Sequence, residues 1–307
     1  MKKRIREREW FRRLRISGRI EVRALKSALA ALLVLATFCP VQPQSVPQPQ
    51  LFSQAAQAIL DRKFPSSDIS YLLLDASGNV IAERWPADKQ AISPGSLVKP
   101  FLAVAYGQQH GGRFPTVRCL GTKTHCWLPA GHGTLGLEEA IVQSCNTYFL
   151  ALASGLDRAS LDHGRAAQSF AHYGLRGPAA GATDESLIGL GTEWKESPLS
   201  LARAYLTLVS EQQSPTQGLL MKGMLGSASR GTARGVDAAL GANAAFAKTG
   251  TADCSHTPPG PADGFTVAVY PAAQPRLLLL VRVHGITGAE AAKLAGAMLA
   301  SLGAGSQ

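Results

Sequence analysis

The sequence has little net charge outside its first 26 residues, and it has no apolar run as long as a membrane-spanning helix usually needs. Of its 307 residues, 17% are charged and 46% are hydrophobic, a balance that excludes an intrinsically disordered chain. Most of the net charge of +10 comes from Lys and Arg within residues 1–26. Nucleic-acid binding needs cations spread over a folded face, so the charge does not indicate a nucleic-acid partner.

The basic segment is followed directly by an apolar run within residues 27–41. Lys and Arg ahead of such a run stay on the cytoplasmic side of a membrane, so we predict a cytoplasmic arm at 1–26 and a signal anchor at 27–41. The run is shorter than the about 20 residues of a spanning helix and also fits the core of a cleaved signal peptide. No clear small-x-small cleavage site follows it, which favours the uncleaved anchor. In both cases the rest of the chain is expected to be extracytoplasmic, in the periplasm.

Residues 42–52 are rich in Pro and Gln, which predicts an extended linker. The folded domain is predicted over residues 53–304, with no internal repeat. Its two early strand-like segments flank a Gly/Asn turn, and three more strands come late in the chain. The predicted strands are 70–75, 80–85, 244–251, 265–270 and 276–284.

The middle of the domain has the apolar spacing of helices. The predicted helices are 96–108, 137–156 and 198–211, and a last one at 288–302 follows the late strands. This order predicts an α+β fold in which both chain ends form a five-stranded antiparallel sheet, flanked by helices, with an all-helical middle subdomain. Strand and helix do not alternate as in a doubly wound fold.

Three short motifs carry groups suited to nucleophilic catalysis. In Ser96-Leu-Val-Lys99, a helix places positions i and i+3 on one face, so the amine can reach the hydroxyl. A desolvated lysine with a lowered pKa can take the proton of a serine and make it a nucleophile. Alone, the motif also fits an ordinary helix start.

The second motif is Ser144-Cys-Asn146, whose Ser and Asn can point the same way. The third is Lys248-Thr249-Gly250-Thr251 at the end of a strand. We expect Gly250 to let a substrate backbone approach closely, Lys248 to supply a cation, and both threonine hydroxyls to hold a carboxylate.

In this order the three motifs match those of β-lactamases and penicillin-binding proteins. Residues 93–101 resemble the Pro-Gly-Ser-Thr-x-Lys-Pro signature of class B penicillin-binding transpeptidases, and residues 188–205 resemble their Gly-x-Gly…Thr-Pro-x-Gln-x-Ala stretch. Residues 119–149 look like the segment before the second motif of elongation-type members. The likeness extends over nearly all of residues 70–285.

The resemblance implies a peptidoglycan DD-transpeptidase that acts on stem peptides ending in D-Ala-D-Ala and is acylated by β-lactams, with no cofactor for catalysis. Ser96 would be the nucleophile and Lys99 its base, and Ser144 with Lys248 would protonate the leaving amine. Asn146 would orient the donor peptide, and Thr249, Gly250 and Thr251 would bind its carboxylate end.

Other functions stay open. A DD-carboxypeptidase uses the same residues, and a non-catalytic penicillin-binding sensor would keep the fold. The Glu-x-x-Leu-Asn pattern of class A β-lactamases does not occur between Asn146 and Lys248, which argues against a β-lactamase. About fifty residues precede the domain, which we expect to be too few for a glycosyltransferase or for the pedestal of ordinary class B members. Any cell-wall synthesis partner therefore stays unknown.

Five cysteines in an exported protein suggest disulfides, and Cys119 and Cys126 could pair across a short loop. Cys119, Cys126, His132 and Cys145 also make a Cys₃His set that suits a structural zinc ion. The sequence leaves the two alternatives open. Trp127 is expected to be a packing residue, and Cys254 has no obvious partner.

Overall fold

The computed structural model describes most of the chain from Gln48 onward. The described ranges are 48–85, 91–191, 193–211, 214–254 and 262–304. The predicted basic arm, the predicted signal anchor and the first part of the predicted linker lie outside these residues. No helix within the described ranges is both long and apolar enough to cross a membrane.

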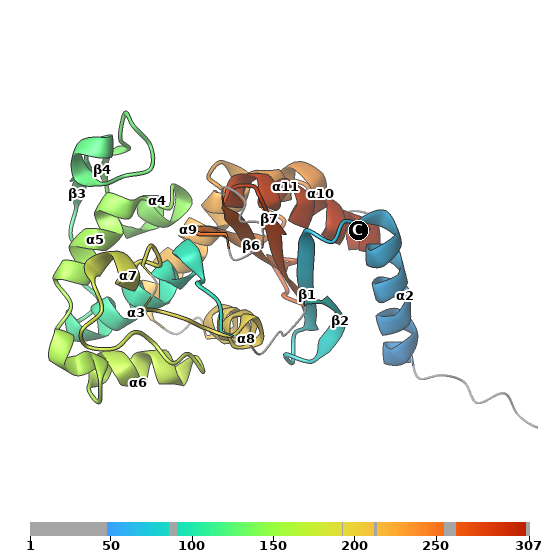
Figure 1. Cartoon of the computed structure of the whole chain (residues 1–307), viewed down its shortest axis with the longest axis horizontal. Helices are drawn as coiled ribbons and strands as arrows, with labels where there is room; N and C mark the ends of the chain where they lie inside the picture. Colours follow the sequence, from blue (N-terminus) through green and yellow to red (C-terminus); the bar gives the residue numbers. More distant parts are fainter. Residues whose placement is uncertain (1–47, 86–90, 192, 212–213, 255–261, 305–307) are drawn as a thin grey trace, which may run out of the picture. The chain divides into compact units, whose positions relative to one another are not determined.

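Five antiparallel strands form one sheet in the order β2-β1-β7-β6-β5 (Figure 1). The early strands β1 (Ile69–Asp75) and β2 (Val80–Arg84) form a hairpin, and β1 also pairs with β7 (Leu277–His284). Strands β6 (Asp263–Tyr270) and β5 (Phe246–Ala252) complete the sheet. The predicted α+β fold, with a sheet made by both chain ends, is confirmed.

The two faces of the sheet are packed differently. Successive side chains of a strand point to opposite faces, so Leu279 and Val281 join one core cluster while Leu278 and Leu280 join the other. The first cluster is rich in alanine, and there α11 (Gly288–Leu299) lies against β5, β6 and β7. Small side chains let this helix lie close to the strands.

The second face is covered by α8 and by the helical middle of the chain. The segments of this part are η1 (Gly95–Val98), α3 (Lys99–Gln109), η2 (Gly121–Thr124), α4 (Leu137–Val142), α5 (Asn146–Ser154), η3 (Arg158–Leu161), α6 (Arg165–His172), α7 (Asp184–Leu187) and α8 (Pro198–Ser210). The chain then enters α9 (Pro215–Ser229) and α10 (Gly235–Leu240), which packs on α11.

Three details differ from the sequence-based expectation. The middle is not all-helical, because β3 (Val117–Cys119) pairs with β4 (Gly133–Leu135); strands of three residues are too short to show a period. The predicted helix 137–156 is two helices, α4 and α5, broken at the second motif. Helix α2 (Gln48–Lys63) begins inside the predicted linker, since proline is tolerated in the first turn of a helix.

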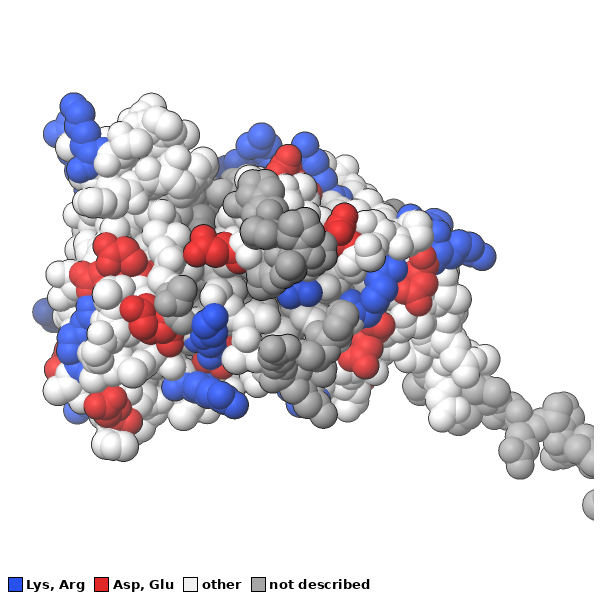
Figure 2. Space-filling view, viewed as in Figure 1, with Lys and Arg blue, Asp and Glu red and all other residues white. Residues whose placement is uncertain are grey.

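Charges of both signs are interspersed over the face of the molecule seen in Figure 2. Lys and Arg do not gather there into one large patch. This agrees with the nearly neutral composition of the chain after its basic N-terminal residues.

Candidate active site

Ser96 stands on a tight turn that is pressed against strand β5. Gly95 before it has a φ of +56°, which glycine adopts without strain. A Cβ at Gly95 would lie 2.7 Å from the Thr251 carbonyl oxygen, so the close approach of the two segments also requires glycine. The Tyr205 hydroxyl donates to the Leu97 carbonyl at 2.7 Å and anchors the turn. Ser96 is partly exposed and lines a cavity, whereas its neighbours are buried.

Lys99 begins α3 one helical turn after Ser96 and is completely buried. Its Nζ donates to the Ser144 carbonyl at 2.9 Å and to Asn146 Oδ1 at 2.6 Å. Burial lowers the pKa of Lys99 to about 7, because an ammonium loses its hydration there. The amine can therefore be neutral near pH 7, as a base must be.

The second motif occupies the break between α4 and α5. Ser144 has a φ of +49°, in the left-handed region, and Asn146 begins α5. Cys145 between them is fully buried. The break turns the Ser144 carbonyl and the Asn146 amide toward Lys99, which a continuous helix with its carbonyls bonded internally would not do.

Lys248 on β5 is also fully buried, and its Nζ donates to Ser144 Oγ at 2.8 Å and to the Thr249 carbonyl at 2.6 Å. Burial, and then the charge of Lys99, lower the pKa of Lys248 well below its ordinary value. Two buried ammonium groups this close repel each other. The pair is thus suited to hold a single mobile proton around Ser144.

The reason for Gly250 differs from the expected one. A Cβ there would lie 3.0 Å from Leu97 Cγ and 3.0 Å from the Pro94 carbonyl oxygen. The glycine therefore lets β5 approach the turn that carries Ser96, in addition to lining the cavity.

The motif threonines have partners within the protein. Thr249 Oγ1 donates to Thr232 Oγ1 at 2.7 Å, which leaves the Thr232 hydroxyl hydrogen for a ligand. Thr251 Oγ1 accepts from the Gly288 N–H at 3.0 Å, so its own hydrogen also stays available. Thr232 was missed from the sequence because a single threonine in a loop carries no motif.

One cavity of about 330 Å³ collects these groups. It is lined by Ser96, Trp127, Ser144, Asn146, Leu190, Thr232, Thr249, Gly250, Thr251, Thr287 and Ala289. The expectation that Trp127 is only a packing residue is wrong, because it is 51% exposed at this cavity. Its Nε1 donates to the Gln143 carbonyl at 3.2 Å.

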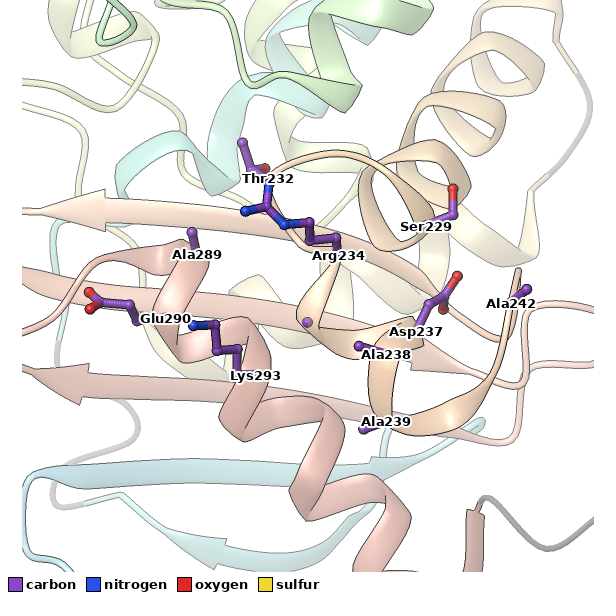
Figure 3. Close-up of a pocket in the computed structure, with 11 residues that line it drawn as sticks. Ser229, Thr232, Arg234, Asp237, Ala238, Ala239, Ala242, Ala289, Glu290 and Lys293 are labelled. Carbon is purple, nitrogen blue, oxygen red and sulfur yellow. The ribbon is translucent and has the colours of Figure 1, made fainter.

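A larger groove of about 870 Å³ adjoins this cavity, since Thr232 and Ala289 line both. It lies between α10 and α11, and Figure 3 shows the Arg234 side chain extending in the direction of Thr232. Glu290 and Lys293 line it from α11. The groove offers charged and hydroxyl groups to a molecule longer than the cavity itself.

The predicted Cys₃His set comes together beside the second motif. Cys119 Sγ and Cys126 Sγ lie 3.6 Å and 3.4 Å from His132 Nδ1, and Cys126 Sγ lies 3.8 Å from Cys145 Sγ. All four ligand atoms are within 4.8 Å of one another. All three cysteines are free in the structure, which has no bond between Cys119 and Cys126.

Solved structures of penicillin-binding proteins share this fold at low sequence identity. Pseudomonas aeruginosa PBP2, solved in complex with WCK 5153, is 20% identical with a TM-score of 0.63, covering 82% of this chain and 76% of that one. Helicobacter pylori PBP2, solved in complex with MreC, is 17% identical with a TM-score of 0.65, covering 81% and 63% of the two chains. The transpeptidase domain of Burkholderia pseudomallei penicillin-binding protein 3 is 17% identical with a TM-score of 0.62, covering 85% and 94%.

No curated protein sequence matches the chain significantly. The family model of the penicillin binding protein transpeptidase domain matches residues 82–302. This match spans all three motifs and every residue that lines the cavity beside Ser96. The chain therefore belongs to the family of penicillin-binding protein transpeptidase domains.

Proposed function

We propose that this protein is a serine-type DD-transpeptidase that cross-links peptidoglycan stem peptides ending in D-Ala-D-Ala. The observation that carries the proposal is the buried pair Lys99 and Lys248, whose amines both donate to Ser144 beside the cavity lined by Ser96. Burying two amines costs free energy, so the arrangement indicates a use for their lowered pKa values.

The first half of the reaction forms an acyl-enzyme. Neutral Lys99 accepts the hydroxyl proton of Ser96 as Oγ bonds to the penultimate carbonyl carbon. The tetrahedral intermediate then collapses and the bond to the terminal D-Ala nitrogen breaks. Ser144 gives its hydroxyl proton to that nitrogen, and the proton on Lys99 returns to Ser144 by way of Lys248. Backbone N–H groups of Ser96 and Thr251 stabilise the oxyanion, at roughly 3–4 kcal/mol for each donor.

In the second half, an amine of a neighbouring stem peptide attacks the ester carbonyl and gives up one proton to neutral Lys99. The bond between that carbonyl carbon and Ser96 Oγ then breaks, and Lys99 passes the proton to Oγ. The donor's terminal carboxylate is held by the hydroxyls of Thr232 and Thr251 and by the positive end of α11, whose first turn lines the cavity. Asn146 orients the donor amide. The groove beyond Thr232 gives room for the rest of a stem peptide. β-Lactams resemble the donor and acylate Ser96 in the same way.

The proposal is tested by incubation of the protein with a labelled D-Ala-D-Ala donor and an amine acceptor, after a check of labelling by penicillin. A transpeptidase yields the cross-linked amide together with free D-Ala. A DD-carboxypeptidase yields free acid instead, and a penicillin-binding sensor acylates without turnover. Amide formation at the rate of D-Ala release supports the proposal, and release of acid alone contradicts it.

Replacing Thr232 with valine removes the hydroxyl assigned to the donor carboxylate and keeps the shape of the side chain. A lost hydrogen bond to a charged group is worth about 1.5 kcal/mol, so we expect KM for the donor to rise about tenfold. Steady-state kinetics checks this. Thr207→Val, whose hydroxyl donates to the Arg203 carbonyl on α8, is the matched control. Equal KM values for the two variants would remove Thr232 from the binding site.

We also propose that Cys119, Cys126, His132 and Cys145 hold a structural zinc ion. In a tetrahedral zinc site, sulfur atoms lie about 3.8 Å apart and sulfur and nitrogen about 3.6 Å apart, from the usual bond lengths. The contacts of 3.8, 3.6 and 3.4 Å fit these values. Four protein ligands leave no open position, so the ion would stiffen the loop beside Ser144 and take no part in the chemistry.

Replacing Cys126 with serine should remove this zinc ion. Zinc at about 100 times its dissociation constant adds about 2.7 kcal/mol to the free energy of unfolding, so the melting temperature should fall by about 5–11 °C. Metal analysis and thermal unfolding of the variant, beside Cys39→Ser as control, check this. An unchanged zinc content would contradict the assignment.

The localisation rests on the sequence alone. We propose that residues 27–41 anchor the chain in the cytoplasmic membrane and that the domain lies on the periplasmic side. Recovery of the full chain in the membrane fraction would support this. The domain should become accessible to added protease only after the outer membrane is permeabilised.

A further inference from the structure

A second group of metal-ligand side chains lies at the end of the sheet, on three neighbouring segments. Strand β6 begins at Asp263, which pairs with Ala252 at the end of β5 and with His284 at the end of β7. Cys254 follows β5 by two residues. The register of the sheet therefore brings a thiol, a carboxylate and an imidazole to one edge.

The ligand atoms of these residues converge. His284 Nδ1 lies 2.5 Å from Asp263 Oδ1 and 3.7 Å from Cys254 Sγ. All three atoms lie within 4.8 Å of one another. Asp263 is almost fully buried and His284 is largely so, so bulk water cannot freely solvate the charges of the group.

The geometry does not suit a Cys-His-Asp catalytic triad. In a triad the carboxylate holds one ring nitrogen and the nucleophile faces the other. Here Asp263 and Cys254 both approach Nδ1 of His284. One ring nitrogen carries either one proton or one lone pair, so it cannot serve both neighbours as a relay.

Convergence on a shared point is the geometry of metal ligands. In a tetrahedral zinc site, sulfur and nitrogen lie about 3.6 Å apart and nitrogen and oxygen about 3.4 Å apart. The sulfur–nitrogen distance of 3.7 Å already fits. The nitrogen–oxygen distance of 2.5 Å is that of a hydrogen bond and would lengthen by about 1 Å around an ion. Thiolate, imidazole and carboxylate together favour zinc over magnesium or calcium.

The net charge of the residues around the group also favours binding of a divalent cation. Arg282 stands two residues before His284, where its guanidinium lies 4.9 Å from the centre of the Trp85 ring and donates to Ser70 Oγ at 3.0 Å. One guanidinium offsets only one of the two anions that a Cys254 thiolate and the Asp263 carboxylate would supply. A zinc ion would bring the group to a net charge near +1.

We propose that Cys254, Asp263 and His284 form a second zinc site, with a fourth position open to water. The ion would join the ends of β5, β6 and β7 just beyond Thr251. It is distinct from the Cys₃His group, which lies on the loop before α5. Its effect would be to hold the end of β5, the strand that carries Lys248 and Thr251, in its place in the sheet.

The experiment counts zinc in the full chain after dialysis against micromolar zinc. We expect Cys254→Ser and His284→Gln each to hold one zinc ion fewer than the wild type. The matched controls, Cys39→Ser and the exposed His163→Gln, should keep the wild-type number. Equal zinc contents in Cys254→Ser and the wild type would overturn the proposal.

A second measurement avoids dependence on folding of the variants and on the Cys₃His site. In the unaltered chain and in Cys126→Ser, zinc should slow alkylation of Cys254 at least tenfold, as followed by peptide mass spectrometry. If the Cys₃His assignment fails, this protection still occurs. If zinc leaves the alkylation rate of Cys254 unchanged in both proteins, the second site does not exist.

Discussion

Ser96→Ala is expected to abolish covalent labelling by a fluorescent penicillin and to lower transpeptidation at least 10³-fold. Loss of a nucleophile removes the acyl-enzyme route altogether, and the residual rate reflects binding alone. Ser96 is partly exposed on the cavity, so alanine there removes a hydroxyl without opening the core. Gel fluorescence after denaturation measures the covalent adduct.

The control for this variant is Ser93→Ala, which changes a serine three residues earlier that does not line the cavity beside Ser96. It should label at the wild-type rate. Labelling of Ser96→Ala at a comparable rate would show that another residue is the nucleophile, and the mechanism proposed above would then be wrong.

The acylation rate is expected to rise with pH and to level off above about pH 7. Burial lowers the pKa of Lys99 to about 7, and nearby Cys145 and Cys126 oppose that shift. Only the neutral amine can take the Ser96 proton, so below this pKa the rate should fall about tenfold for each pH unit. Second-order rate constants for penicillin acylation from pH 5 to 9 measure this.

The matching variant is Lys99→Met, which keeps an apolar chain of similar length at a completely buried position. Loss of a general base lowers rates by about 10²–10⁴-fold. The residual acylation rate of the variant should no longer rise with pH up to about pH 7. Melting temperatures over the same pH range show whether the fold is intact. A wild-type rate constant that does not vary between pH 5.5 and 8.5 would remove Lys99 from the role of base.

The fold could be predicted because its signals are local and repeated. Strands such as β6 and β7 are long enough to show their apolar pattern, and α11 begins at a capping box of Thr287 and Glu290. The motif residues that line the cavity were found because three motifs in a fixed order resemble one family, whereas residues such as Leu190 and Thr287, which also line it, belong to none of the three motifs. The resemblance did not predict Thr232 as a site residue, because Thr232 lies outside the motifs and meets Thr249 only in the folded chain.

The break at Ser144 could not be predicted for a different reason. Apolar spacing continues from α4 into α5, and neither Gln143 nor Cys145 is a helix breaker. The positive φ of Ser144 is a conformation that non-glycine residues adopt only where the surroundings supply compensation. Here that compensation comes from Lys99 and Lys248, which bind its carbonyl and its hydroxyl. The site's chemistry and its backbone geometry thus depend on the same two amines.

The pairing of β1 with β7 has a consequence for how the protein acquires its structure. Ser70 lies opposite Arg282 in this ladder, so the sheet joins residues from nearly opposite ends of the domain. Such non-local pairing makes folding slow, because a long stretch of chain must lose conformational entropy before the contacts between β1 and β7 form. In a chain delivered from its N-terminus, Ser96 and Lys99 would come long before Lys248, and β1 would have an unpaired edge until β7 follows. With the periplasmic location proposed above, we expect this protein to need chaperone protection until its last strands are delivered, and to bind penicillin only after that.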